Sequence, residues 1–113
     1  MRTLNSLTLL LAASFYVPMV LAADAAINIS KPVGGTIFSP TAKIDISYEA
    51  TPGPKGDHVH LVVDDRKPIV VHQLKDSHSI DPLAPGKHGI CARIVDKDHV
   101  EIGVQDCVMF RVE

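Results

Sequence analysis

The stretch G-D-H-V-H-L-V-V-D-D, residues 56–65, alternates its side chains in a way that predicts a half-buried β-strand. The residues at every second position, which we assign to the core, are Val59, Leu61 and Val63. His58 and His60 begin the opposite, outer face. On a strand, an H-x-H pair places both imidazoles on one side, with Cα atoms about 7 Å apart. This stretch therefore predicts both an element of the fold and a candidate site.

On both sides of this strand the chain consists of short alternating runs separated by Pro, Gly and Asp, and none keeps helical spacing for three turns. The runs predicted as strands are 26–30, 36–38, 43–49, 58–64, 69–74, 77–81, 87–95 and 104–112. The second run resumes the first on the other sheet, after the turn signal K-P-V-G-G. About seven short strands in about ninety residues predict an all-β, immunoglobulin-like β-sandwich. A cupredoxin-like or other Greek-key barrel is the alternative.

The N-terminal segment has the pattern of a signal peptide that is cleaved before the domain functions. Arg2 precedes the mostly apolar run 7–21, and small residues follow that run. A membrane anchor is the alternative, but the run is short, contains Pro18 and lacks a following basic cluster. We therefore predict a signal peptide over 1–23 and one domain over 24–113. This implies a periplasmic or secreted protein with no stable membrane insertion after cleavage.

The charge balance makes nucleic acid an unsuitable partner. The chain has 11 basic and 13 acidic side chains, and loss of Arg2 with the signal peptide leaves an acidic domain. No basic stripe runs along any predicted strand. The sequence also lacks G-x-S-x-G, H-E-x-x-H and paired-acid frameworks, so we do not expect an enzyme.

The two cysteines predict a disulfide, because an exported chain meets an oxidising compartment. Cys91 and Cys107 lie on the strand faces that also carry arginine, and an unpaired arginine is too costly to bury. Both cysteines therefore point outward from one sheet. A hairpin register that pairs Ile94 with Val104 sets them directly opposite each other. In the alternative interpretation, reduced cysteines and Met109 form a thiolate site suited to Cu(I).

The histidines are the strongest indication of a function. The chain has six, against two Tyr and no Trp, and imidazole is a common ligand for zinc and copper. In an immunoglobulin-like topology, the start of the His58 strand and the loop that carries His99 lie at the same end of the sandwich. The sequence thus predicts a metal site of His58, His60 and His99, with Asp57 as a fourth ligand or as a residue that orients a histidine. The alternative is that these histidines are structural or contact a partner.

The remaining histidines are placed elsewhere. His88 begins its strand at the opposite end, near Asp64 and Asp65, and is a further candidate together with Asp64. His72 and His78 are interpreted as surface residues.

The sequence resembles a family of small exported bacterial domains of unassigned function. The family's motifs read like G-H-H-H-L-L-I-D and P-G-K-H-T-L, followed by a D-x-x-H-V-P loop. The corresponding stretches here are D-H-V-H-L-V-V-D, P-G-K-H-G-I and D-K-D-H-V, with valine in place of the central histidine and glutamate in place of the last proline. The residues that match are His58, His60, Asp64, His88 and His99. The resemblance implies an exported β domain and implies no reaction.

Three hypotheses follow for the function. In the first, the domain is a small periplasmic binding module that takes copper or zinc through the histidine cluster and needs no other cofactor. In the second, it is an envelope accessory module whose sheet face or loops contact another envelope protein. In a third, narrower hypothesis, His58 and His60 gain charge together near pH ~6.5 and act as a pH sensor. The sequence leaves the oligomeric state open.

Overall fold

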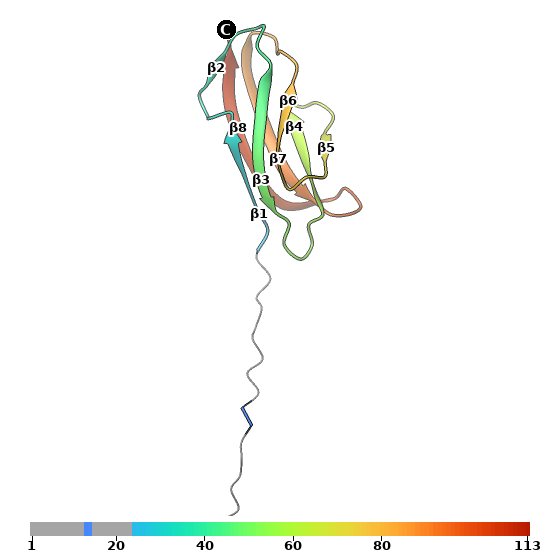
Figure 1. Cartoon of the computed structure of the whole chain (residues 1–113). Coiled ribbons are helices and arrows are strands. Elements are labelled where there is room, and N and C mark those ends of the chain that lie inside the picture. Colours follow the sequence, from blue (N-terminus) through green and yellow to red (C-terminus); the bar gives the residue numbers. More distant parts are fainter. Residues whose placement is uncertain (1–12, 15–23) are drawn as a thin grey trace, which may run out of the picture.

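The structure is a computed structural model that describes residues 13–14 and 24–113, and this part of the chain forms eight β-strands (Figure 1). They are β1 (Ala26–Lys31), β2 (Ile37–Phe38), β3 (Ile44–Thr51), β4 (His58–Val63), β5 (Ile69–Val71), β6 (Lys75–Ile80), β7 (Gly86–Val95) and β8 (Glu101–Val112). The predicted signal peptide, 1–23, lies outside the described residues apart from positions 13 and 14, so it stays a prediction. Within the described residues, no helix has the length and apolarity needed to cross a membrane.

The strands form two sheets, in the orders β1-β3-β6 and β2-β8-β7-β4-β5. All pairings are antiparallel except the short parallel contact of β2 with β8. The chain changes sheets between β1 and β2, as the K-P-V-G-G turn signal predicted. The two layers confirm the predicted immunoglobulin-like sandwich, in place of the alternative barrel.

The core lies between the sheets and is built from alternate residues of each strand. In β3, Ile44, Ile46 and Tyr48 are at most 2% exposed, as the alternation predicted. The opposing layer contributes Val59, Leu61, Val63, Ile90, Ala92 and Ile94. β4 differs from the other strands because all six of its residues are buried. Its outer face must therefore be covered by other parts of the chain.

The hairpin of β7 and β8 has the predicted register through its middle. Cys91 pairs with Cys107, and their sulfurs form a disulfide 2.10 Å long. The predicted register continues to Arg93 and then shifts, so that Val95 pairs with Glu101. A bulge of this kind bends the strand locally. The bend comes directly before the loop that carries His99.

The disulfide rules out the alternative interpretation of a thiolate site. The part of the chain that the structure describes contains no free cysteine, because Cys91 and Cys107 are bonded to each other. A disulfide sulfur lacks the negative charge that makes a thiolate a good ligand. The side chain of Met109 is 62% exposed and lies over Gly89, where a Cβ would come within 2.9 Å of its sulfur. Met109 therefore fills the space left by a residue without a side chain.

Candidate metal centre

His58 and His60 lie on the outer face of β4, as predicted, but they are much more buried than an outer-face position implies. His58 is 2% exposed and His60 is 8% exposed. β4 lies between β7 and β5, so both of its edges are hydrogen-bonded. The rings of His99 and His72, which come from two different loops, pack against His58. Other histidines therefore cover the buried pair.

The loop between β7 and β8 holds His99 over the outer face of β4. The side-chain Oδ1 of Asp96 accepts hydrogen bonds from the backbone N–H groups of Asp98, at 2.9 Å, and Val100, at 3.0 Å. The N–H of His99 donates to the carbonyl of Asp96 at 3.1 Å, which closes a turn. His99 has a φ of 64°, a left-handed conformation in which histidine is found more often than most residues. The turn thus fixes the direction of the His99 side chain.

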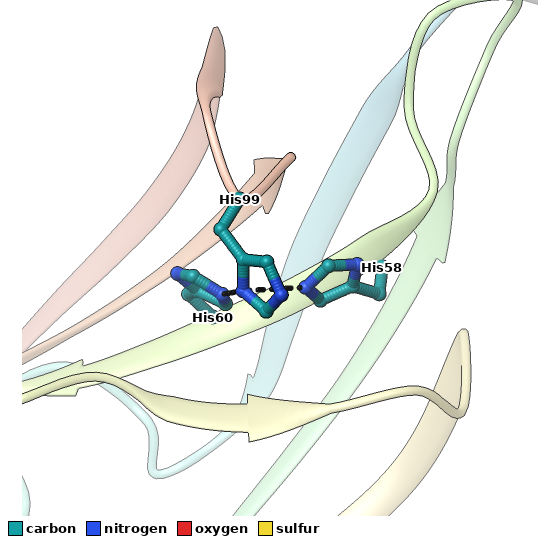
Figure 2. Close-up of side chains that lie close together, drawn as sticks. All are labelled: His58, His60 and His99. Atoms are coloured by element: carbon teal, nitrogen blue, oxygen red, sulfur yellow. Dashed lines mark hydrogen bonds between the residues drawn. The ribbon is translucent and has the colours of Figure 1, made fainter. Parts of the chain in front are cut away.

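Three ring nitrogens converge where His99 meets β4 (Figure 2). Nδ1 of His99 is 3.3 Å from Nε2 of His58 and 3.0 Å from Nε2 of His60. The ligand atoms of the three residues all lie within 4.8 Å of one another. These three residues are called the histidine cluster below. They are the three histidines that the sequence grouped together.

The protons available in the histidine cluster cannot satisfy all three nitrogens at once. Nδ1 of His58 lies 2.9 Å from Oδ2 of Asp57, so that nitrogen donates its proton to the carboxylate. In a neutral ring the other nitrogen, Nε2, then carries a lone pair. His99 Nδ1 has at most one proton to share between the two Nε2 atoms that face it. Nε2 of His58 therefore presents a lone pair to the cluster, and an unprotonated nitrogen is what a metal ion requires of a histidine ligand.

The electrostatics of the histidine cluster favour a neutral ring at His60. Burial lowers the pKa of His60, and the charges that His58 and His99 would carry lower it further. Glu101 acts in the opposite direction but does not reverse the shift. A neutral imidazole is the form that binds a metal.

The dimensions of the histidine cluster are close to those of a metal centre. Zinc–nitrogen bonds of about 2.0–2.1 Å in a tetrahedral site separate the ligand nitrogens by about 3.4 Å. The two measured separations from His99 Nδ1, 3.0 and 3.3 Å, are near this value. Three imidazoles leave a fourth position for water or another ligand. Asp57 contacts Nδ1 of His58 and not the nitrogen that faces the cluster, a position from which its carboxylate can orient the His58 ring.

Sequence reasoning missed the position of His72. This residue is exposed, as predicted, but its ring centroid lies 4.9 Å from that of His58. Asp57, His58 and His72 form a second group whose ligand atoms lie within 4.8 Å of one another. The register of β4 and β5, in which Val59 pairs with Val71, places His72 beside His58. A correct prediction of that register would have found the contact.

His88 lies away from the histidine cluster, as predicted, and makes different contacts. Its Nδ1 lies 2.7 Å from Oδ2 of Asp64, and its Nε2 lies 2.6 Å from the carbonyl oxygen of Ala84. Oδ1 of Asp64 also accepts the N–H of Gly89 at 2.9 Å. We call His88, Asp64 and the Ala84 carbonyl the histidine latch. Among the described residues, His88 and Asp64 belong to no group of three potential ligands.

The histidine latch favours a charged ring, because both ring nitrogens face acceptors. Hydrogen bonds to Asp64 and to the Ala84 carbonyl raise the pKa of His88. Burial alone would raise the pKa of Asp64, but hydrogen bonds from His88 and Gly89 outweigh it and leave the pKa lowered. The latch therefore favours the form of His88 in which both nitrogens carry a proton, and that form has no lone pair for a metal.

Comparison with known proteins supports the fold. The chain is similar to the fibronectin(III)-like modules of Clostridium thermocellum CbhA, with a TM-score of 0.62 and 21% sequence identity over 76% of this chain and 93% of that chain. It is also similar to part of the extracellular domain of the putative one component system BT4673 from B. thetaiotaomicron. That match has a TM-score of 0.53 and 9% identity, and covers 78% of this chain and 15% of that chain. No protein family and no curated protein matches the sequence.

Proposed function

We propose that this chain is a small exported module that binds one copper or zinc ion through His58, His60 and His99. The observation that carries the proposal is the convergence of two ring nitrogens, Nε2 of His58 and Nε2 of His60, on Nδ1 of His99 at 3.3 and 3.0 Å. Imidazole ligands suit both metals. The proposal assigns no catalytic reaction to the site.

An exported location is part of the proposal. A disulfide between Cys91 and Cys107 is typical of proteins that fold in an oxidising compartment. The predicted signal peptide and the resemblance to a family of small exported bacterial domains point the same way. A periplasmic or secreted module would meet metal ions outside the cytoplasm, where their supply varies.

A metal titration of the chain over residues 24–113 tests this function. We expect at least one tight equivalent of Zn²⁺ or Cu²⁺ by calorimetry and elemental analysis, and no tight equivalent in the double variant His58→Ala/His60→Ala. His78→Ala, on β6 in the other sheet, is the matched control and should bind as the wild type does. Equal and weak binding by the wild type and the double variant would overturn the proposal.

A second variant guards against a folding artefact, since His58 and His60 are buried. His99→Asn removes one ligand from an exposed loop position, and asparagine tolerates the left-handed backbone found there. We expect this variant to keep the wild-type circular dichroism spectrum and to lose most of the metal affinity. A folded His99→Asn protein with unchanged affinity would exclude His99 from the site.

The alternative function, an envelope interaction module, is supported by a different surface. Ile37 is 61% exposed and Met109 is 62% exposed. Both line a hollow of about 450 Å³ together with Lys87 and Arg111. Exposed apolar groups rimmed by charges are common at protein interfaces. Co-purification of a stoichiometric partner that survives chelator, and that is lost in Ile37→Ser/Met109→Ser, would favour this function.

A further inference from the structure

His58 presents its two ring nitrogens to two different sets of ligands. Nε2 faces His99 Nδ1 in the histidine cluster at 3.3 Å. Nδ1, on the opposite side of the ring, faces Oδ2 of Asp57 at 2.9 Å. An imidazole can bind a metal through either nitrogen. His58 is thus placed to contact two ions and not only one.

The second set of ligands is as compact as the first. Asp57, His58 and His72 offer ligand atoms that all lie within 4.8 Å of one another. His72 comes from the end of β5, and its ring centroid is 4.9 Å from that of His58. Asp57 and His72 are both exposed, so an ion can reach them directly from solvent. The set combines one carboxylate oxygen with two imidazoles, a mixture that suits Zn²⁺ and Cu²⁺.

The two sets share His58 and no other residue. The histidine cluster gathers on the Nε2 side of His58, toward His60 and His99. Asp57 lies on the Nδ1 side. Two ions on opposite sides of one ring would use every ligand in this part of the surface.

We propose that a second metal ion binds between Asp57, Nδ1 of His58 and His72, and that the His58 ring bridges it to the ion in the histidine cluster. This inference rests on the proposed function, because the bridge requires the first ion at Nε2. The second ion displaces the proton that Nδ1 donates to Asp57, and that proton leaves to solvent. The ring then carries one negative charge as an imidazolate and binds an ion at each nitrogen. With the Asp57 carboxylate, it supplies two negative charges to offset the added dication.

A Cu²⁺ titration followed by elemental analysis and electron paramagnetic resonance tests the bridge. We expect two equivalents per chain. The first should give a full cupric signal, and the second should reduce the total signal, because an imidazolate couples the two unpaired electrons. Two equivalents with the full signal of two isolated ions would overturn the bridge.

His72→Ala separates the second ion from the first. We expect this variant to keep the first equivalent and its full signal and to lose the second equivalent. The control, His78→Ala, should keep both. One equivalent in the wild type, or two in His72→Ala, would overturn this inference and leave the proposed function standing. No tight equivalent in the wild type would overturn both.

Discussion

The histidine cluster and the histidine latch lie at opposite ends of β4 and use the same residue type in opposite ways. In the cluster, histidine faces histidine, and the pKa of His60 is lowered. In the latch, histidine faces a carboxylate and a carbonyl, and the pKa of His88 is raised. One end therefore favours a neutral imidazole at His60, and the other favours a charged imidazole at His88. The partners of a histidine, more than its strand or its motif, determine what it can do.

This contrast divides the four histidines that the sequence motifs group together. His58, His60 and His99 meet in space, while His88 binds Asp64 at the far end of the strand. A motif that contains all four therefore combines two physical roles. One role is suited to binding an ion, and the other holds the turn before β7 against the turn after β4.

The largest expected effect comes from the disulfide, which joins β7 to β8 between the two ends. Cys91 and Cys107 are 16 residues apart, and a closed loop of that length stabilises the fold by about 3 kcal/mol in the chain-entropy model. We expect Cys91→Ala/Cys107→Ala to lower the free energy of unfolding by about this amount in urea denaturation. If the histidine cluster and the histidine latch do not depend on the disulfide, the folded variant should keep the wild-type metal affinity. Its stability should also depend on pH as that of the wild type does. Loss of metal binding by the folded variant would show that the cluster depends on the disulfide.

Metal binding should stabilise the histidine cluster and leave the histidine latch unchanged. An ion at 100 times its dissociation constant raises the free energy of unfolding by about 2.7 kcal/mol. We expect Zn²⁺ to raise the melting temperature of the wild type and of Asp64→Asn equally, because the latch holds no metal. His99→Asn should show little or no rise. A gain that disappears in Asp64→Asn would contradict the separation of the two sites.

The fold could be predicted because its signals are local. The period-two pattern of β3 and β4 assigned each residue to a face, and the cost of burying arginine placed Cys91 and Cys107 outward. The direct opposition of the cysteines then followed from one register. Each of these steps needs only neighbouring residues and the geometry of a strand.

The burial of the site could not be predicted in the same way. It depends on the loop turning His99 back over β4, which requires a φ of 64° and the hydrogen bonds of Asp96. The contact of His72 depends on the register of β4 and β5, which no cysteine or arginine indicates. One of the two acceptors of the His88 ring in the latch is a backbone carbonyl, that of Ala84, which no side-chain pattern can reveal.

The contribution of the latch to the free energy of unfolding should decrease as the pH rises. The pKa of His88 is raised in the folded chain, so its contribution is fully present below the unfolded value of about 6.5. That contribution is lost as the pH rises through the folded pKa. We expect Asp64→Asn to cost about 1 kcal/mol at pH 6 and much less at high pH, measured by urea denaturation. This figure is below the usual range of about 1.5–3 kcal/mol for a hydrogen bond to a charged group, because the Asp64 side chain is 34% exposed.

The comparison of wild type with Asp64→Asn isolates His88 from the histidine cluster. His60, with its lowered pKa, makes stability fall as the pH drops, but it does so equally in both proteins. Asparagine also accepts the φ of 52° at position 64, so the backbone has no reason to change. A difference between the two proteins that stays constant from pH 6 to pH 9 would show that the latch is not an ion pair.

The smallest expected effect comes from a change in the loop that carries His99. It tests whether the conformation of this loop positions His99 in the histidine cluster. Asp96→Ala removes the acceptor of two backbone N–H groups and should let His99 move away from His58 and His60. We expect metal affinity to fall by about threefold, less than 1 kcal/mol, since each such bond contributes only modestly. Asp98→Ala, two residues along in the same loop, removes the same charge and should change the affinity less. Equal losses in the two variants would mean that charge attracts the ion, and that the turn does not position His99 for it.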